Sequence, residues 1–257
     1  MPSLNRTVRR ALPVLTLLSL IPLWELCCRL FEVPTFVLPA PSDIARAFVE
    51  VEPARWLGHL WATLRVALAG FAISLAISIP LAVLMVRSRF LSQTLYPLLV
   101  VIQSTPIVAI APLIIVLFGT GWAPRLAITS LITFFPLVVS ATTGMLATPQ
   151  ELIELSRSLR SSPTREIWYV RLPYAIPHLF SGMKVAVTLA IIGAVVAEFV
   201  AAEEGLGYFV QFSTSYFKIP QAFAALLFLS VVSLALFKGV QLLQALLFRW
   251  SLPRDKT

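Results

Sequence analysis

The sequence has few charges, few cysteines and few histidines, and each shortage excludes a class of protein. Charged side chains make up 12% of the 257 residues, whereas an average soluble domain has about 25%. Such a chain cannot cover a water-soluble globule of its size, and its 58% of hydrophobic residues excludes intrinsic disorder. The only cysteines, Cys27 and Cys28, are adjacent and form no disulfide framework. The composition is that of an integral membrane protein.

The motifs of common enzymes are also missing. No lysine follows a glycine, so the phosphate-binding loop of ATPases is absent. The sequence lacks the Gly-x-Ser-x-Gly and His-Glu-x-x-His motifs, and His59 and His178 lie at predicted span ends, where amphipathic rings are common. We therefore expect no catalytic residue, no metal site and no cofactor, which argues against an intramembrane enzyme and against a self-powered pump.

Long runs without charge locate the membrane spans, since a transmembrane helix needs about 20 mainly apolar residues. They predict an all-α, polytopic protein whose single membrane domain covers residues 1–257. The six predicted spans are residues 11–30, 60–86, 93–118, 124–146, 179–202 and 221–248. We expect the first run to be a retained helix, not a signal peptide, because no small-x-small cleavage site follows it.

The basic residues set the orientation through the positive-inside rule. With both termini in the cytoplasm, the inner segments hold 13 bases and four acids, whereas the outer segments hold six bases and eight acids. The remaining base, Lys238, lies in the sixth span. Basic inner loops therefore explain the net charge of +8, and no basic face is left for a nucleic acid.

The segment between spans four and five, residues 147–178, is predicted to form two short amphipathic helices. Thr148 and Glu151 make a capping box with Pro149 at the first helical position, and Ser162-Pro163 starts the second helix. A stripe of leucines follows one face of the first helix, at Leu152, Leu155 and Leu159. The opposite face carries charges, at Glu151, Glu154, Arg157 and Arg160.

Such helices either lie on a membrane surface or dock into a soluble partner, and their spacing alone leaves both interpretations open. Pro173 and Pro177 are expected to break the chain before span five.

The same segment resembles the E-A-A-x3-G-x9-I-x-L-P loop of ATP-binding-cassette (ABC) importer permeases. Glu154 falls on the Glu, Val170 on the Ile and Leu172-Pro173 on the Leu-Pro of that pattern. Leu155 and Ser156 replace the two alanines.

Arg160 stands at the glycine position of this pattern. Glycine permits a left-handed turn that costs an ordinary residue about 1–2 kcal/mol. We therefore expect the turn to shift to Ser161-Ser162 or to be remodelled.

Two further stretches, Pro22 to Ser42 and Ala194 to Tyr208, resemble the nitrate/sulfonate/taurine permease group, whose features pyrimidine-precursor and riboflavin permeases share. The resemblance implies a type I ABC importer permease fold and a multi-pass protein of the inner membrane. It also implies a second copy of this chain, two copies of an ATPase subunit that binds ATP, and a solute-binding protein. The ATPase contacts are expected at Glu151, Glu154, Arg157, Arg160, Val170, Leu172 and Pro173.

The resemblance implies a small organic or anionic nutrient, such as a sulfonate, nitrate or taurine. The alternative is that the same kind of importer carries riboflavin, or a pyrimidine precursor used in thiamine biosynthesis. A stand-alone secondary transporter is the alternative from another class, although the two halves of the chain show no repeat of the kind common in such transporters.

Polar residues within the spans are candidates for the translocation path. Gln103-Ser104-Thr105 precedes Pro106 and interrupts span three. The hydroxyls there either line a path or bind the backbone groups that the interruption leaves without partners. Glu198 and Arg65 lie near the outer ends of spans five and two, and we consider an ion pair between them. The outer loops, Phe31 to Gly58 and Gly205 to Pro220, are expected to receive the binding protein.

Overall fold

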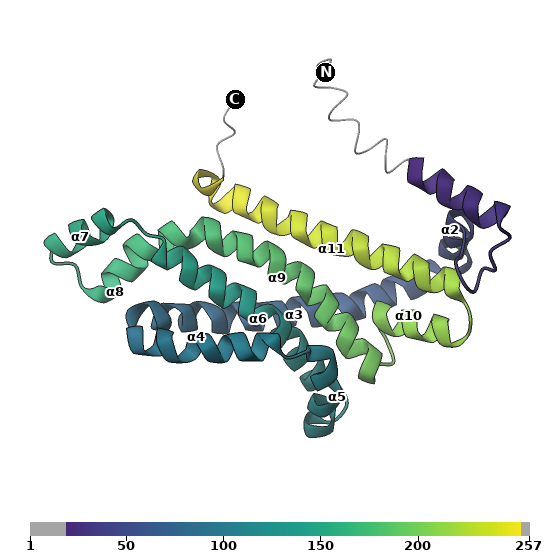
Figure 1. Ribbon diagram of the computed structural model, residues 1–257, viewed down its shortest axis with the longest axis horizontal. Coiled ribbons are helices and arrows are strands. Elements are labelled where there is room, and N and C mark those ends of the chain that lie inside the picture. Colours follow the sequence, from purple (N-terminus) through teal and green to yellow (C-terminus); the bar gives the residue numbers. More distant parts are fainter. Residues whose placement is uncertain (1–18, 253–257) are drawn as a thin grey trace, which may run out of the picture.

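A computed structural model describes residues 19–252, and every regular element within this range is a helix. Four long helices form the body of the molecule (Figure 1): α3 (Pro53–Arg87), α6 (Trp122–Leu146), α9 (Leu172–Ala201) and α11 (Ile219–Leu247). Each is long and apolar enough to cross a membrane. The all-α prediction is confirmed, and the spans predicted at 124–146 and 221–248 match α6 and α11 closely.

The predicted number of six spans is not reproduced in the described residues. They contain four candidate spans, or five if the bent pair α4 (Arg89–Ser104) and α5 (Ile107–Phe118) counts as one. The predicted first span, 11–30, lies partly outside the described residues, and its part from 19 to 30 is helical.

The third predicted span, 93–118, is broken, because α4 and α5 meet at an angle of 95°. Pro106 has no amide hydrogen and is the N-cap of α5. Ser104 Oγ donates to Val100 O at 2.8 Å and Thr105 Oγ1 donates to Val101 O at 3.1 Å. The predicted interruption of span three at Pro106 is therefore confirmed.

Helix α6 lies between α3 and α9 and packs along both of them. Small residues permit this close approach, as they do in many membrane helix pairs. A Cβ added at Gly193 of α9 would lie 2.9 Å from Thr129 Cα of α6, so no larger residue fits there without a shift. On the other side, Ser74 Oγ of α3 donates to Ser130 O of α6 at 2.7 Å.

Helix α9 begins at Leu172, well before the predicted residue 179, and continues without a break. Pro173 occupies its first turn, where a backbone donor is not needed, and Pro177 is tolerated inside the helix. The π-helix η1 (Ile167–Arg171) and the short helix α8 (Pro163–Glu166) precede it directly. The two prolines therefore do not end the segment before span five, as the sequence had suggested.

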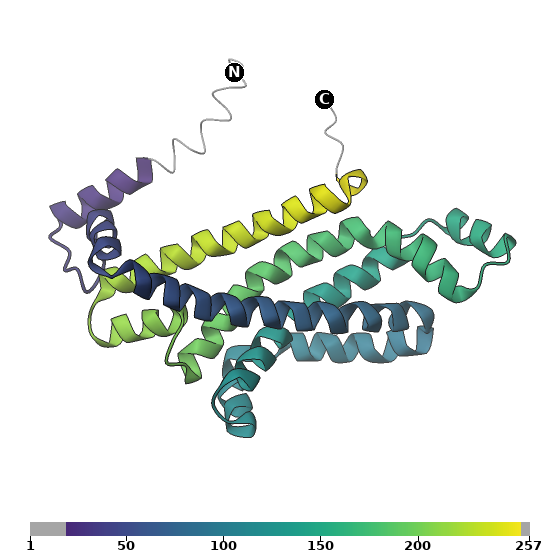
Figure 2. The same cartoon turned by 180° about the vertical axis from the view of Figure 1, so that it is seen from behind.

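The two ends of the bundle carry different short helices, as Figure 1 and Figure 2 show from opposite sides. Helices α7 (Gln150–Ser158) and α8 lie at one end, and α2 (Pro41–Glu50) and α10 (Leu206–Ser215) lie at the other. At the α10 end an aromatic cluster fixes the packing, since the Trp56 ring lies 5.0 Å from that of Phe209 and 5.8 Å from that of Phe228.

Candidate functional site

Residues 147–178 contain the two predicted short helices, α7 and α8, but only one start agrees with the prediction. Ser162 Oγ accepts from the Arg165 amide at 3.3 Å and Pro163 opens α8, as expected. Helix α7 instead has Pro149 as its N-cap. The predicted capping box of Thr148 and Glu151 was wrong, because the buried Thr148 hydroxyl donates to Met145 O at 3.0 Å and so closes the end of α6.

The turn after α7 stays at Arg160, which has a φ of 54°. The Ser161 amide donates to Ser156 O at 3.1 Å, and the Arg160 amide donates to Arg157 O at 2.9 Å. These two bonds form a Schellman end, which offsets the cost of the left-handed conformation. The expected shift to Ser161-Ser162 was therefore wrong, and an arginine takes the conformation that glycine has in the E-A-A-x3-G pattern.

A buried carboxylate joins the two parts of this segment. Glu166 Oε2 accepts from Arg157 Nε of α7 at 3.2 Å, and Glu166 Oε1 accepts from Arg171 Nε of η1 at 2.8 Å. The Arg171 guanidinium also donates to Met145 O at 3.4 Å, which ties the segment to α6. The π-helix makes the Glu166–Arg171 pair possible, because its wider turn aligns residues five apart.

The leucine stripe lies open to the surroundings. Leu152, Leu155 and Leu159 are 42%, 56% and 75% exposed. With Tyr169 and Val170 they line a hollow of about 590 Å³, which we call the leucine groove. The charged residues Glu151, Glu154, Arg157 and Arg160 are all exposed on the same segment. The arrangement presents an apolar depression with charges nearby, which suits a protein partner.

Glu198 lies at the opposite end of α9, where it caps α10. Its side chain is buried, with 1% exposed, and its Oε2 accepts from the Gly207 amide at 2.7 Å. The Gly205 amide donates to His59 Nδ1 at 3.1 Å and the Leu206 amide donates to Thr63 Oγ1 at 2.8 Å. Amides that have no partner within the helix are thus bound by side chains of α3 and α9.

Arg65 has other partners than Glu198. Its guanidinium pairs with Glu204 and lies 4.6 Å from the centre of the Trp122 ring. The Arg65–Glu198 ion pair considered from the sequence is not formed, because Glu198 is engaged by the amide end of α10 and Arg65 by the loop that precedes it.

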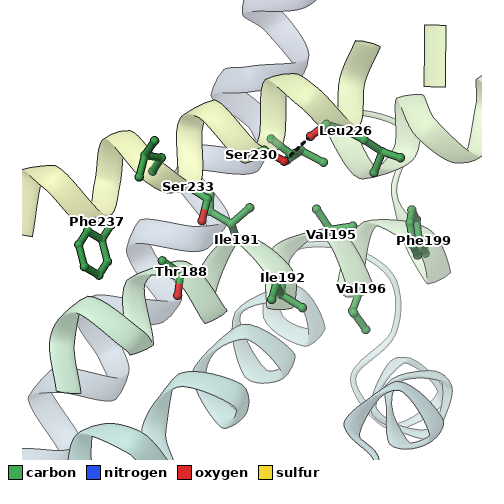
Figure 3. A pocket seen from close by; sticks show the side chains of 12 residues that line it. Thr188, Ile191, Ile192, Val195, Val196, Phe199, Leu226, Ser230, Ser233 and Phe237 are labelled. Carbon is green, nitrogen blue, oxygen red and sulfur yellow. Dashed lines mark hydrogen bonds between the residues drawn. The ribbon is translucent and has the colours of Figure 1, made fainter. Parts of the chain in front are cut away.

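A second hollow, of about 750 Å³, runs between α9 and α11 (Figure 3). Its lining is mostly aliphatic, and its polar groups are the hydroxyls of Thr188, Ser230 and Ser233. Thr188 Oγ1 donates to Val185 O at 2.7 Å and Ser230 Oγ to Leu226 O at 2.9 Å. None of the described residues that line this α9–α11 groove carries a charge, and Gln103-Ser104-Thr105 is not among them.

Comparison with known proteins identifies the family. Residues 70–251 match the model of the binding-protein-dependent transport system inner membrane components. The chain belongs to this family. The permease is therefore a transport component of the inner membrane and not an enzyme, and ATP is bound by a separate ATPase subunit.

Curated relatives cover almost the whole permease. It is 32% identical to the formylaminopyrimidine transport permease ThiX of Halalkalibacterium halodurans, over 96% of this chain and 98% of ThiX. It is 38% identical to the riboflavin permease RibX of Chloroflexus aurantiacus, over 93% of this chain and 89% of RibX. The taurine permease TauC of Escherichia coli is 28% identical, over 91% and 88%.

A solved structure shares the fold of the permease. The inward-facing MetNI methionine ABC transporter matches with a TM-score of 0.65 and 21% identity, over 79% of this chain and all of that one. The type I importer fold that the sequence suggested is therefore supported.

Several residues that organise the permease were missed by the sequence analysis. Glu166 is not among the residues expected from the sequence, because its pairing with Arg171 depends on a π-helix. His59 was interpreted as an interfacial ring. A usable signal existed, since His59 and Thr63 are four residues apart and so share a face of α3.

Proposed function

We propose that this permease forms the membrane channel of an importer in which two copies of the chain pair with two ATPase subunits. A solute-binding protein delivers a small nutrient on the outer side. We place both termini in the cytoplasm with six spans, and the 13 bases and four acids of the inner segments support this orientation. The leucine groove is the observation that carries the proposal, because it leaves a shaped apolar surface on the basic inner side.

The ATPase is proposed to bind at the leucine groove and at the charges beside it. Glu154 accepts from Gln150 Nε2 at 3.3 Å within α7, so its carboxylate stays on the exposed face. The clamp on Glu166 and the Schellman end at Arg160 hold α7 in one place relative to α8. Leu172 and Pro173 then belong to the first turn of α9 and connect this surface to the membrane span.

Helix α9 gives the ATPase a mechanical connection to the far side. Residues from Pro163 to Ala201 are helical without interruption, through α8, η1 and α9. The 30 residues of α9 alone span about 45 Å. A movement of the leucine groove is therefore carried along α9 to Glu198 and the start of α10, where access from the outer side is set.

For the solute, we favour an uncharged heterocycle such as a pyrimidine precursor or riboflavin. The relatives with such names are 32% and 38% identical, whereas the sulfonate and taurine relatives are 27% and 28% identical. The α9–α11 groove lacks charged and free cationic groups, and an anion is costly to move through such a surface. A sulfonate-, nitrate- or taurine-like nutrient is the second candidate.

Co-purification tests the assignment. The permease is expressed with its ATPase and purified through a tag on the permease, as wild type, as Leu155→Glu and as Val49→Glu. Val49 is 85% exposed on α2, at the other end of the molecule, and is the matched control. Leu155→Glu should lose the ATPase and Val49→Glu should retain it. Equal recovery of ATPase with Leu155→Glu and wild type would sink the proposed docking surface.

A further inference from the structure

A polar pocket lies beside the start of α10, at the opposite end of α9 from the leucine groove. It has a volume of about 630 Å³, within the range of sites for small molecules. Three segments line it: the start of α6 with Arg125, the end of α9 with Phe199, and the loop and first turns of α10 with Glu203, Tyr208 and Gln211. We call this hollow the α10 pocket.

The charges around the α10 pocket balance. One base, Arg125, and two carboxylates, Glu203 and Glu204, line it. Glu204 is in turn paired with Arg65, which lies over Trp122. The pocket therefore has no excess of positive charge with which to attract a sulfonate or nitrate, and its two carboxylates repel such an anion.

The other lining groups suit a flat, uncharged molecule. Tyr208 is half-buried, and the centre of its ring lies 6.1 Å from that of His59 and 5.9 Å from that of Phe212, so contacts with two neighbouring rings restrain it. The exposed amide of Gln211 offers both a donor and an acceptor. An aromatic face with a nearby amide matches the stacking surface and hydrogen-bonding edge of a nitrogen heterocycle.

Phe199 lies between this pocket and the α9–α11 groove, because its side chain lines both hollows. In Figure 3 its ring lies at one end of the groove, beyond Val195 and Val196 on the same helix. A solute that leaves the α10 pocket along α9 must therefore pass this side chain, which is 41% exposed.

We propose that the α10 pocket admits an uncharged planar nitrogen heterocycle, which contacts Tyr208 and Gln211, and that Phe199 separates this pocket from the α9–α11 groove. The inference rests on the proposed function, since it assigns the entry site of the same transport path. Selection at this pocket adds to the selection made by the binding protein.

Uptake by the complete importer tests the contacts in the pocket. Cells that express the permease, ATPase and binding protein are given labelled formylaminopyrimidine, riboflavin or ethanesulfonate. Tyr208→Leu should raise the KM for the imported heterocycle about five-fold, whereas Tyr208→Phe should retain the wild-type KM because it keeps the ring. Gln211→Ala, at an exposed position, should raise the KM about three-fold.

Tyr216→Leu is the matched control, because Tyr216 at the C-cap of α10 contacts the same Phe212 ring but lies outside the pocket. Wild-type KM values for both Tyr208→Leu and Gln211→Ala would overturn the pocket. If the importer takes up ethanesulfonate but neither of the two heterocycles, the pocket proposal is also overturned, whereas the permease assignment stays intact. Failure of the permease to retain any ATPase would instead overturn the proposed function.

The role of Phe199 is tested by leakage. Membrane vesicles that contain the complete importer are loaded with the heterocycle, and its loss is followed without ATP. Phe199→Ala should leak about five times faster than wild type with little change in KM, and Phe199→Tyr should behave as wild type. Val185→Ala, on the same helix but outside both hollows, is the control. Equal leak rates for Phe199→Ala and Val185→Ala would show that Phe199 separates nothing.

Discussion

The two ends of α9 use similar residue types in opposite ways. At the α7 end, polar groups are used internally, in the Glu166 clamp, and leucines are left outside. At the α10 end, leucine and phenylalanine are buried, and a carboxylate, an imidazole and a hydroxyl bind the amides of a helix start. The first end leaves an apolar surface exposed, where we propose that the ATPase docks, and the second keeps a short helix in place.

The α10 end should be the more fragile of the two. A Cβ at Gly205 would lie 2.2 Å from Glu198 Cδ, and the φ of 122° is itself unfavourable for other residues. Gly205→Ala should therefore destabilise the protein by about 2–5 kcal/mol and abolish most uptake. Thermal unfolding and uptake of the imported solute measure this.

Gly58→Ala is the control for Gly205→Ala, since nothing lies within 4 Å of a Cβ at that position. If both variants unfold at the wild-type temperature, the close packing of Glu198 against α10 does not exist.

The α7 end should lose coupling when its internal clamp is removed. Glu166→Gln keeps the shape of the side chain but removes the charge that holds Arg157 and Arg171. We expect a local loss of about 1–3 kcal/mol and weaker ATPase binding, with membrane insertion unchanged. Glu50→Gln, the same change at an exposed position of α2 at the other end of the molecule, should have no effect. Equal ATPase recovery from both variants would contradict the clamp.

A charge reversal on the surface of the same end should act on the partner alone. Glu154→Lys should uncouple ATP hydrolysis from transport because the carboxylate contributes to register and specificity at the docking surface. The ATPase rate and the uptake rate are measured in the same vesicles. Unchanged uptake would remove Glu154 from the contact surface.

The smallest expected effect is a gain in the stability of the turn after α7. Arg160→Gly removes a left-handed arginine from the end of α7 and should stabilise that turn by about 1–2 kcal/mol. Limited proteolysis of the segment should become slower while thermal unfolding of the whole protein changes little. Faster cleavage would mean that the arginine side chain itself holds the turn.

Helix positions were predictable from sequence where hydropathy decides them, as for α6 and α11. The start of α3 was missed, because its first turns carry Arg55 and His59 and lie beyond the apolar run. Pro173 and Pro177 were wrongly expected to break the chain, because the cost of a proline depends on whether its position in the helix needs a backbone donor. The 95° turn between α4 and α5 could be located at Pro106 but not measured from sequence.

The functional residues were also predictable only in part. The leucine stripe was predictable, because helical periodicity shows which residues share a face. The partners of Glu198, Arg65 and Glu166 were not, because each depends on residues brought together by the fold. Glu198 in particular is an ordinary intramembrane acid in the sequence, and only the position of the Gly207 amide gives it a role.

The central claim is that the leucine groove is the surface through which the ATPase moves α9. It is tested most directly by a cross-link from Leu155→Cys, in a protein whose Cys27 and Cys28 are replaced by serine, to the ATPase of the assembled importer. We predict a permease–ATPase product from Leu155→Cys and none from Val49→Cys. A product from Val49→Cys, with none from Leu155→Cys, would contradict the account.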